Sequence, residues 1–403
     1  MTNEEALLRD VDRLCTDEAM RSLIARAAFG ETAPPPAAFD LRIHPADQML
    51  LHSLRHLGDA NAAFSQYYNV ALQQYRAARD VMRAIFPGRM QALRILDFAC
   101  GFGRLLRFLR PAAPQAPIRA AEIQEEALAF VKERFGVETI LSAFDPEAFQ
   151  PREHFDVTWA ASLFSHLPPR LFHAWLARLL RLPGEEGIVC FTVHDACLLP
   201  DPARMTEDGI LFFPSSENPG LDTSVYGTTY VTEAFVREAV ARAGGGEFDC
   251  RRIPRALAHE QDLYVAMRRG AHDPALLDGF RYGPWGWVDE KRLSAAEGLY
   301  LRGWAASLDD GQVDFVDIRV GKQVFRCPTG LPRDDVARVF ADPRLAACGW
   351  EFRHPVSRDG NGPVRVEATA RSACGEMALL YAGDLPPAPA APPRSLLQRL
   401  LGR

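Results

Sequence analysis

The sequence predicts an α/β protein in three parts: a helical N-terminal region, a doubly wound sheet of mainly parallel strands that ends in an antiparallel hairpin, and a small all-β sandwich domain. Two observations lead to this prediction. Between residues 92 and 270, short apolar segments alternate with amphipathic helical segments, as expected for a parallel sheet covered on both faces. After Arg269 the apolar residues recur with a period of two, which is typical of antiparallel strands.

The chain accordingly divides into four regions, residues 1–91, 92–270, 271–385 and 386–403. The first is helical because apolar residues recur at helical spacing from Asn3 to about Ala28 and from Pro45 to Ile85. The last begins with a Pro/Ala-rich linker and ends in a short amphipathic tail from Ser395 to Arg403. This tail could add only a weak peripheral contact with a membrane surface.

The sequence of the second region, residues 92–270, predicts alternating strands and helices. Strands are expected at Arg94–Phe98, Ile118–Glu122, Thr139–Ser142, Phe155–Ala160, Gly187–Val193 and Gln261–Met267. Helices are expected at Leu105–Leu109, Glu125–Arg134, Pro168–Arg181 and Thr232–Ala243. A further strand near Phe248–Ile253 is joined to the last one without a helix, so these two strands should form a hairpin.

The sequence of the third region, residues 271–385, predicts antiparallel strands. Val313–Val320 and Val324–Arg326 flank Gly321-Lys322, which is typical of a hairpin with a two-residue turn. Further strands are expected at Tyr300–Ala306, Gly349–Arg353, Val364–Ala370 and Ala378–Ala382, with one helix at Asp334–Phe340. The region also contains Trp285, Trp287, Trp304 and Trp350. These tryptophans either fill the core of the sandwich or present aromatic faces to a glycan.

Composition argues against several classes of partner. The formal net charge of -6 gives no general attraction for nucleic acid or an anionic membrane. None of the eight cysteines forms a Cys-x-x-Cys pair, which predicts reduced thiols. The N-terminus lacks the features of an export signal, and no apolar run reaches the roughly 18 residues that span a bilayer. We therefore expect a cytoplasmic protein.

A glycine-rich turn carries the clearest functional signal. In the segment Ile95–Arg104 an apolar strand leads to Asp97, then to small residues and to Gly101 and Gly103 before a helix. Such a turn lets the backbone come very close to a bound ligand. Glu122 ends the next strand, about 20 residues after Gly101, where an acidic group can accept hydrogen bonds from both hydroxyls of a ribose.

A dinucleotide site is the alternative interpretation of this turn. Gly101-x-Gly103-x-x-Leu106 is a partial dinucleotide fingerprint, and Leu106 stands where the third glycine would be. The expected terminal hairpin also argues against a nicotinamide-dependent oxidoreductase.

The sequence resembles the class I methyltransferases, which have a Rossmann-like sheet, and in particular a bacterial group with the pattern Leu-Asp-Phe-Gly-Cys-Gly-x-Gly-Arg. The resemblance extends from about Ile43 to Arg269 and rests on further segments, Phe155–Val157, Ala161–Leu167, Trp175-Leu176, Leu180–Gly184, Phe191–His194, Tyr226–Tyr230 and Gln261–Leu263. Two departures are present: Ala99 replaces the first glycine of the pattern, and Glu185-Glu186 interrupts a Pro-Gly-Gly segment.

The resemblance implies S-adenosylmethionine as the cofactor. It implies that Asp97, Ala99, Gly101 and Gly103 line the methionine end and that Glu122 binds the ribose. Phe144 or Asp145 would lie by the adenine, although Phe144 could instead fill the core. Ser162 would face the sulfonium, and Tyr68 is a weaker candidate for closing over the cofactor.

Methyl transfer by direct displacement requires an aligned nucleophile, a dry site and a proton acceptor, but no nucleophilic enzyme residue. His166 and His194 follow neighbouring strands, so either could act as the base, and Asp195 could orient His194. His166 could instead cap the next helix. No cluster of metal-ligand residues is evident, which predicts a metal-independent mechanism.

Three functions remain open. The first is an enzyme that methylates an oxygen or nitrogen of a small metabolite or glycan. The second is a non-catalytic protein that serves as an assembly platform in surface-polysaccharide synthesis. The third is the nicotinamide-dependent oxidoreductase. The all-β region resembles small β-sandwiches attached to bacterial glycosyltransferases and methyltransferases, so it could bind a glycan or merely pack on the enzyme.

Overall fold

The computed structural model describes residues 3–30, 39–214, 223–294, 297–356 and 362–387. The chain forms two compact units. The first contains residues 1–283 and 376–379, and the second contains residues 284–375 and 380–403. The helical region before residue 92 therefore folds with the sheet in one unit.

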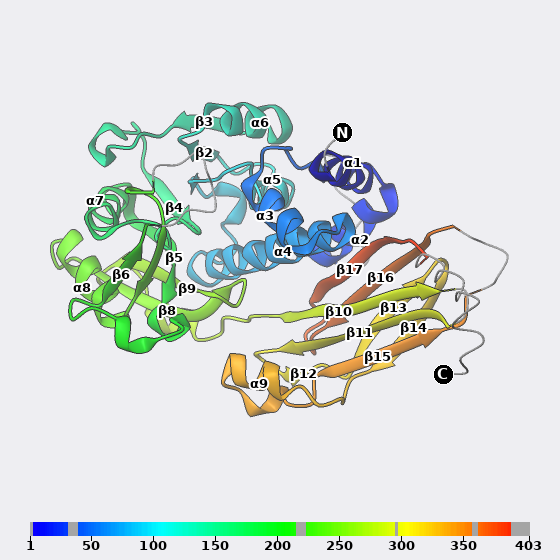
Figure 1. The fold of residues 1–403 in the computed structure, drawn as a ribbon. Coiled ribbons are helices and arrows are strands. Elements are labelled where there is room, and N and C mark those ends of the chain that lie inside the picture. Colours follow the sequence, from blue (N-terminus) through cyan, green and yellow to red (C-terminus); the bar gives the residue numbers. More distant parts are fainter. Residues whose placement is uncertain (1–2, 31–38, 215–222, 295–296, 357–361, 388–403) are drawn as a thin grey trace, which may run out of the picture. The chain divides into compact units, whose positions relative to one another are not determined.

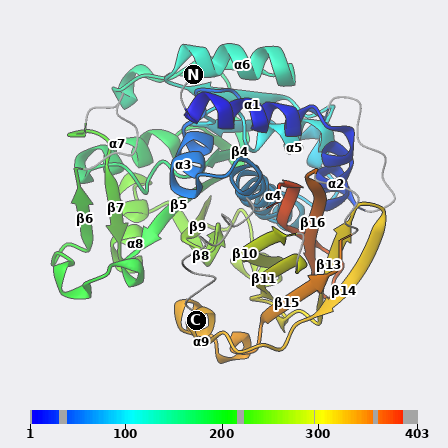
Figure 2. The ribbon, with the colours of Figure 1, turned by 45° about the vertical axis from the view of Figure 1, so that its right-hand side comes forward.

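Four described helices precede the sheet, and the first three pack around the fourth (Figure 2). They are α1 (Asn3–Cys15), α2 (Glu18–Phe29), α3 (Gln48–Leu57) and α4 (Ala60–Ile85). Each of the two helical stretches expected from the sequence is thus divided. Asp17 accepts hydrogen bonds from the N–H groups of Ala19 and Met20 and so starts α2. Gly58, with a φ of 59°, ends α3, and the side chain of Asp59 caps α4.

The sheet of the first unit has nine described strands in the order β3-β2-β1-β4-β5-β7-β6, with β9 beside β5 and β8 beside β9. The strands are β1 (Ile95–Phe98), β2 (Ile118–Glu122), β3 (Glu138–Leu141), β4 (Phe155–Ala160), β5 (Pro183–Asp195), β6 (Ile210–Phe213), β7 (Thr228–Val231), β8 (Phe248–Leu257) and β9 (Gln261–Arg268). Strands β1 to β5 pair in parallel, and β8 and β9 form an antiparallel hairpin. The predicted fold class is confirmed.

Helices cover both faces of this sheet (Figure 1). They include α5 (Leu106–Ala112), α6 (Glu125–Phe135), α7 (Pro169–Leu179) and α8 (Glu233–Ala243). On one face α4, α5 and α6 follow one another, and on the other α7 packs against α8. A buried apolar cluster joins α7 and α8 to the sheet, and Phe98 contacts Trp175 there with their ring centres 4.9 Å apart.

The central strand β1 is mainly apolar in sequence because it is buried inside the sheet. All four of its residues are buried, and Ile95 lies opposite both Ile118 of β2 and Val157 of β4. Asp97 is therefore a carboxylic acid on a strand that is covered on both sides. The carboxyl ends of β1 to β5 meet at one edge, where the following turns build a cavity.

Strands β6 and β7 were not predicted. Strand β7 pairs with the end of β5, where His194 lies opposite Tyr230, and β6 pairs with β7. Strand β5 also begins at Pro183, earlier than expected, and its pairing with β4 contains an irregularity at Phe155–Val157.

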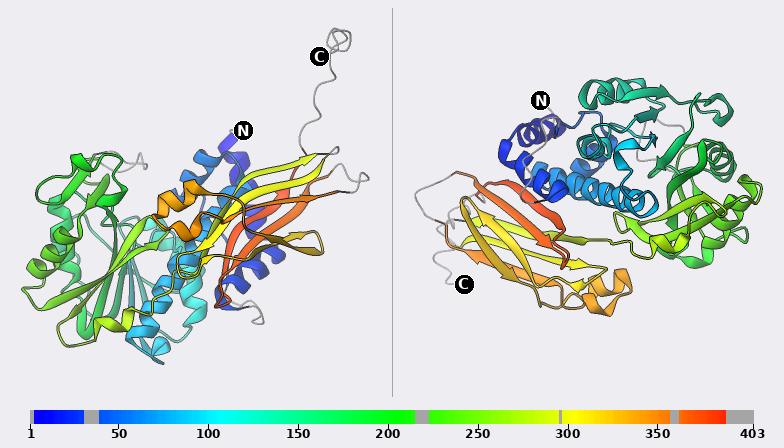
Figure 3. Two further views of the ribbon diagram at one scale, coloured as in Figure 1. Left: turned by 90° about the horizontal axis from the view of Figure 1, so that it is seen from below. Right: turned by 180° about the vertical axis from the view of Figure 1, so that it is seen from behind.

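The second unit contains two four-stranded antiparallel sheets that stack on each other (Figure 3). One sheet contains β10 (Pro284–Ser294), β11 (Gly298–Ser307), β12 (Gly311–Gln312) and β15 (Gly349–His354). The other contains β13 (Phe315–Val320), β14 (Gln323–Pro328), β16 (Val364–Arg371) and β17 (Met377–Leu385), although residues 377–379 at the start of β17 are grouped with the first unit. The two-residue turn between β13 and β14 and the helix α9 (Asp334–Phe340) are as predicted. Strand β10 was missed, because a bulge between Val288 and Glu290 breaks its period-two pattern.

Some tryptophans of the second unit belong to its packing. Trp350 is completely buried, and the ring of Trp304 lies 5.9 Å from that of Phe340 on α9. The predicted C-terminal tail lies outside the described residues, as does most of the linker. None of the helices in the described part of the chain combines the length and apolar character needed to cross a lipid bilayer. Short 3-10 helices complete the fold at Met90–Ala92, Pro146–Ala148, Ala196–Leu198, Pro202–Arg204, Pro274–Leu277 and Pro343–Leu345.

Gly103 should contribute strongly to the stability of the fold. Its φ is 76°, and a Cβ atom there would lie 2.5 Å from a ring carbon of Phe135 and 2.9 Å from a methyl carbon of Val131, both on α6. We expect Gly103→Ala to lower the free energy of unfolding by about 3 kcal/mol, because backbone strain adds to overpacking. Gly136→Ala is the control: its φ is 61° but its Cβ would meet no atom within 4 Å, so it should cost only about 1 kcal/mol. Urea unfolding measures both variants, and an equal loss of unfolding free energy in the two would contradict this packing role of Gly103.

Candidate functional site

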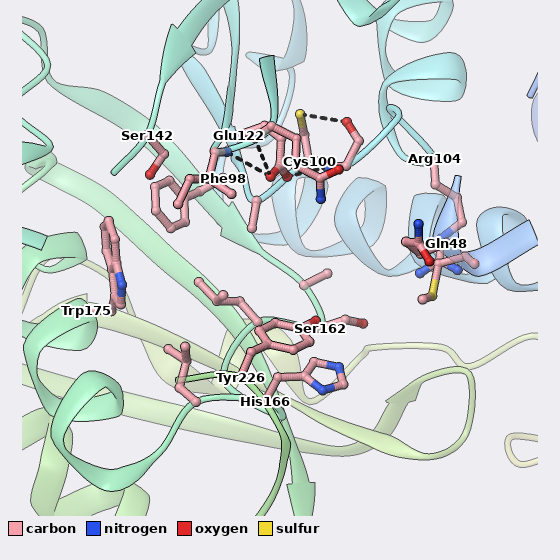
Figure 4. Close-up of a pocket in the computed structure, with 18 of the residues that line it drawn as sticks. Gln48, Phe98, Cys100, Arg104, Glu122, Ser142, Ser162, His166, Trp175 and Tyr226 are labelled. Atoms are coloured by element: carbon pink, nitrogen blue, oxygen red, sulfur yellow. Dashed lines mark hydrogen bonds between the residues drawn. The ribbon is translucent and has the colours of Figure 1, made fainter. Parts of the chain in front are cut away.

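A cavity of about 570 Å³ opens at the carboxyl ends of β1 to β5 (Figure 4). The turns that follow these strands form most of its wall, and further wall residues come from α3, α4, α7, the segment Val225–Tyr230 and Glu260. Ligands of open α/β sheets bind at this edge, because the strand ends diverge there into loops that leave a crevice. The N-terminal helices and the sheet thus build one site.

The turn after β1 contributes mainly backbone to the cavity. Gly101 lines it with a φ of 53°, and a Cβ atom at this position would meet nothing within 4 Å. Ala99 also lines it and has a φ of 56°. The alanine that replaces a glycine of the family pattern therefore has an unfavourable left-handed backbone besides its extra methyl group. Gly103 does not reach the cavity wall; its missing side chain makes room for α6.

Two carboxyl groups lie behind this turn in different environments. Glu122 accepts hydrogen bonds from the backbone N–H groups of Gly101 (2.9 Å), Ile123 (2.8 Å) and Gln124 (3.3 Å). Asp97 is 3% exposed, and its Oδ2 atom has no hydrogen-bond partner among the described residues. Burial, and secondly the charge of Glu122, raise the pKa of Asp97 to about 8. Asp97 is therefore largely uncharged at neutral pH until a cation comes near it.

Arg104 is the single Arg or Lys side chain that the described residues place in the cavity wall. Its Nε–H donates to the Oε1 atom of Gln74 on α4 over 3.3 Å. Its charge also opposes, by a smaller amount, the rise in the pKa of Asp97. Arg104 was not among the residues predicted from the sequence to bind the cofactor, although it directly follows Gly103 in the glycine-rich segment.

His166 lies in the wall after β4, and its neighbours define which ring nitrogen carries the proton. Its Nδ1 lies 2.7 Å from the carbonyl oxygen of Gly227, which can only accept, so Nδ1 is the donor. The neutral ring then has its lone pair on Nε2. The ring stacks on Tyr226 with centres 4.6 Å apart (Figure 4). His166 does not cap α7, because the N-cap residue is Pro168.

His194 also lines the cavity, but its chemistry differs from that of His166. Burial, and secondly the charge of His166, lower the pKa of His194 to about 4, so it is neutral at pH 7 and a weak base. Asp195 does not orient it as expected. The carboxylate of Asp195 accepts instead from the N–H of Cys197 and forms an ion pair with Arg252 at 2.8 Å, outside the cavity wall.

Three further residues were expected at the cofactor. Phe144 lines the cavity and is 66% exposed, so it does not fill the core. Asp145 lies outside the wall, where its side chain accepts from the N–H of Glu147. Ser162 lines the cavity with a φ of 55°.

Tyr68 was expected to close over the cofactor, but the structure places it elsewhere. It is fully buried, and its hydroxyl donates to the carbonyl of Leu41 and lies 3.0 Å from the guanidinium of Arg107. Arg107 is itself completely buried and also donates to Tyr67, whose hydroxyl donates to Asp47 over 2.8 Å. Tyr68 therefore belongs to the packing between α4 and α5.

Several wall residues were not identified from the sequence. Aromatic side chains come from α7 and from the segment before and within β7, and polar and thioether side chains come from α3. These residues are Trp175, Tyr226, Tyr230, Gln48 and Met49. Trp175 and the tyrosines lie in segments that carried the family resemblance, which was the available signal. No local pattern marks Gln48 or Met49.

Known proteins show limited similarity to the chain. The magnesium protoporphyrin IX methyltransferase of Synechocystis, solved with bound S-adenosylhomocysteine, is 16% identical over 54% of this chain and 94% of its own, with a TM-score of 0.36. A structure titled a DhpI-SAM-HEP complex is 17% identical over 54% of this chain and 97% of its own, also with a TM-score of 0.36. An S-adenosylmethionine-dependent methyltransferase of Clostridium acetobutylicum is 12% identical over 49% of this chain and 92% of its own, with a TM-score of 0.36.

No curated protein sequence matches the chain. A protein-family model does match part of it, and this part includes the glycine-rich turn, Glu122 and His166. Residues 96–189 match the model of a methyltransferase domain.

Proposed function

We propose that this chain is an S-adenosylmethionine-dependent methyltransferase that transfers a methyl group to an oxygen or nitrogen of a small metabolite or glycan. The observation that carries the proposal is the buried Asp97 Oδ2, which has no partner among the described residues and lies in the cavity wall beside a glycine turn. A buried carboxyl oxygen without a donor is unfavourable unless a ligand supplies one. An ammonium group supplies both the donor and the charge.

The residues of the cavity fit this cofactor along its length. Asp97 would hold the ammonium group of the methionine moiety, and Arg104 its carboxylate. Glu122 would accept hydrogen bonds from the ribose, since an ionised carboxylate offers more acceptor sites than the three backbone donors use. Phe144 and Trp175 offer aromatic faces for the adenine.

When bound, S-adenosylmethionine supplies a methyl group on a sulfonium, which is activated for direct displacement. The remaining tasks are to orient the acceptor, to exclude water and to remove a proton. We assign proton removal to the Nε2 atom of His166, because the carbonyl of Gly227 fixes the required tautomer. His194, with its lowered pKa, is the poorer base.

The charges of the wall favour an uncharged or cationic acceptor. Besides Arg104, the wall presents four carboxyl groups, of which Asp97, with its raised pKa of about 8, carries little charge until a cation comes near, and His194 adds no charge at neutral pH. The four are Asp47, Asp97, Glu122 and Glu260. An acceptor with a carboxylate or phosphate next to the reacting atom would be repelled, whereas a sugar hydroxyl or an amine would not.

Binding of S-adenosylhomocysteine should tighten as the pH rises. Below its pKa of about 8, Asp97 must lose a proton to pair with the ammonium, so affinity should rise between pH 6 and 8 and level off above. Calorimetry at pH 6, 7 and 8 measures this dependence. The Asp97→Asn variant should bind S-adenosylhomocysteine at least tenfold more weakly at pH 8, and its affinity should no longer depend on pH. No affinity for S-adenosylhomocysteine, or comparable affinity for NAD, would overturn the proposed function.

Arg104 should contribute to binding only through the amino-acid end of the ligand. We expect Arg104→Met to weaken S-adenosylhomocysteine about tenfold, as for loss of one charge-assisted hydrogen bond. Methylthioadenosine lacks the amino-acid group, so its affinity should change less than about twofold. Arg110→Met on α5, the helix that begins just after Arg104, is the matched control, because Arg110 lies outside the cavity wall. Equal losses for both ligands would contradict this assignment.

The two histidines should differ in their effect on turnover. We expect His166→Gln to slow methyl transfer about a hundredfold, which is the usual contribution of a general base, with little change in S-adenosylhomocysteine affinity. His194→Gln should slow it less than tenfold, because its proton affinity is low. Transfer of a labelled methyl group from S-adenosylmethionine to a fractionated small-molecule extract measures both. A His166→Gln enzyme with the wild-type rate would refute this role.

A further inference from the structure

Ser162, in the cavity wall, has a backbone conformation that must be held in place. It directly follows the end of β4 and Ala161, and its φ of 55° lies in the left-handed region. This region is unfavourable for any residue with a Cβ atom, and glycine is the residue that adopts it without cost. Residues in such conformations persist only where the surrounding structure fixes them.

Two hydrogen bonds hold Ser162, and a third joins the two side chains that make them. Its N–H donates to the Oγ1 of Thr192 over 2.7 Å, and its Oγ–H donates to the Oε1 of Gln261 over 3.1 Å. The hydroxyl of Thr192 in turn donates to the same Oε1 atom over 2.6 Å. Every hydrogen is used once, and the amide oxygen of Gln261 receives two of them. The three side chains therefore form one closed set.

Thr192 and Gln261 do not line the cavity themselves. Thr192 lies within β5 and is completely buried, and Gln261 is the first residue of β9, which pairs with β5. The sheet thus supplies rigid anchors for the turn that leaves β4. Without them, Ser162 would be driven towards a right-handed or extended conformation, and the peptide groups on both sides of it would rotate.

Such a rotation would disturb both ends of the proposed reaction. Ala161, Ser162 and Leu163 line the cavity, and the carbonyl of Leu163 accepts from the N–H of His166 over 2.9 Å. The same turn therefore shapes the wall and holds the backbone of His166, the residue that we assign as the base (Figure 4).

We infer that Thr192 and Gln261 are positioning residues, which hold Ser162 in its left-handed conformation and so shape the wall for the methyl donor. This inference rests on the proposed function. It assigns a role in ligand binding to two side chains that touch neither ligand.

Variants of Thr192 test the inference with S-adenosylhomocysteine as the probe. We expect Thr192→Val to weaken binding about tenfold, because Val matches Thr in shape but cannot accept from the N–H of Ser162. Thr192→Ser keeps the hydroxyl and should bind within about threefold of the wild type. Thr158→Val is the matched control: Thr158 is equally buried on β4, and the described residues offer its hydroxyl no partner. It should leave the affinity unchanged.

A double-mutant cycle separates positioning from a general effect on folding. In Ser162→Gly the left-handed backbone carries no penalty, so Thr192→Val should cost less than threefold there instead of tenfold. Thermal unfolding of each variant is measured alongside. If Thr192→Val does not fold, Gln261→Leu, which removes the shared acceptor, replaces it in the same cycle.

Each outcome is decisive. The inference is supported if Thr192→Val lowers the affinity for S-adenosylhomocysteine tenfold, Thr192→Ser keeps nearly the wild-type affinity, and the effect of Thr192→Val is smaller in the Ser162→Gly background. Wild-type affinity in Thr192→Val, or a loss of the same size in Thr158→Val or with Ser162→Gly present, overturns it while leaving the proposed function intact. Failure of the wild-type protein to bind S-adenosylhomocysteine overturns the proposed function and the inference with it.

Discussion

The cavity depends above all on the carboxylate of Glu122, which ties the turn after β1 to the end of β2. By accepting from Gly101, Ile123 and Gln124 it holds two strand ends together and concentrates negative charge beside Asp97. Burial, and secondly this charge, raise the pKa of Asp97 to about 8. One hydrogen-bonded side chain thus holds the shape of the turn and contributes to the electrostatics of its neighbour.

Left-handed backbone recurs at this edge of the sheet, and each instance has its own cause. Gly101 has a left-handed backbone and faces open space, whereas Gly103 has one where it packs against α6. Ala99 and Ser162 have left-handed backbones although they carry side chains. The first two are glycines for different reasons, one to leave the cavity open and one to let a helix approach. The other two must be stabilised by their surroundings, and for Ser162 those surroundings are Thr192 and Gln261.

Sequence patterns predicted the elements of the central sheet well, because its strands are continuous apolar runs between amphipathic helices. They failed where local pattern is weak: the bulge at Val288–Glu290 concealed β10, and β7 pairs only with the end of β5 and with β6. At the site, the carboxyl ends of strands could be located from sequence. Tyr68 and Asp195 could not be placed correctly, because their partners, Arg107 and Arg252, lie far away in sequence and only the packing reveals them.

The buried guanidinium of Arg107 has a consequence for how the chain can be divided. It lies on α5, directly after the glycine turn, yet its hydrogen-bond acceptors, Tyr67, Tyr68 and the carbonyl of Arg42, all come from the N-terminal region. A shortened chain starting at residue 92 would strand a positive charge in an apolar interior or expose it by opening the helix. The leading helices therefore belong to the same core as the sheet, and a chain without them would need a different first helix after the glycine-rich turn.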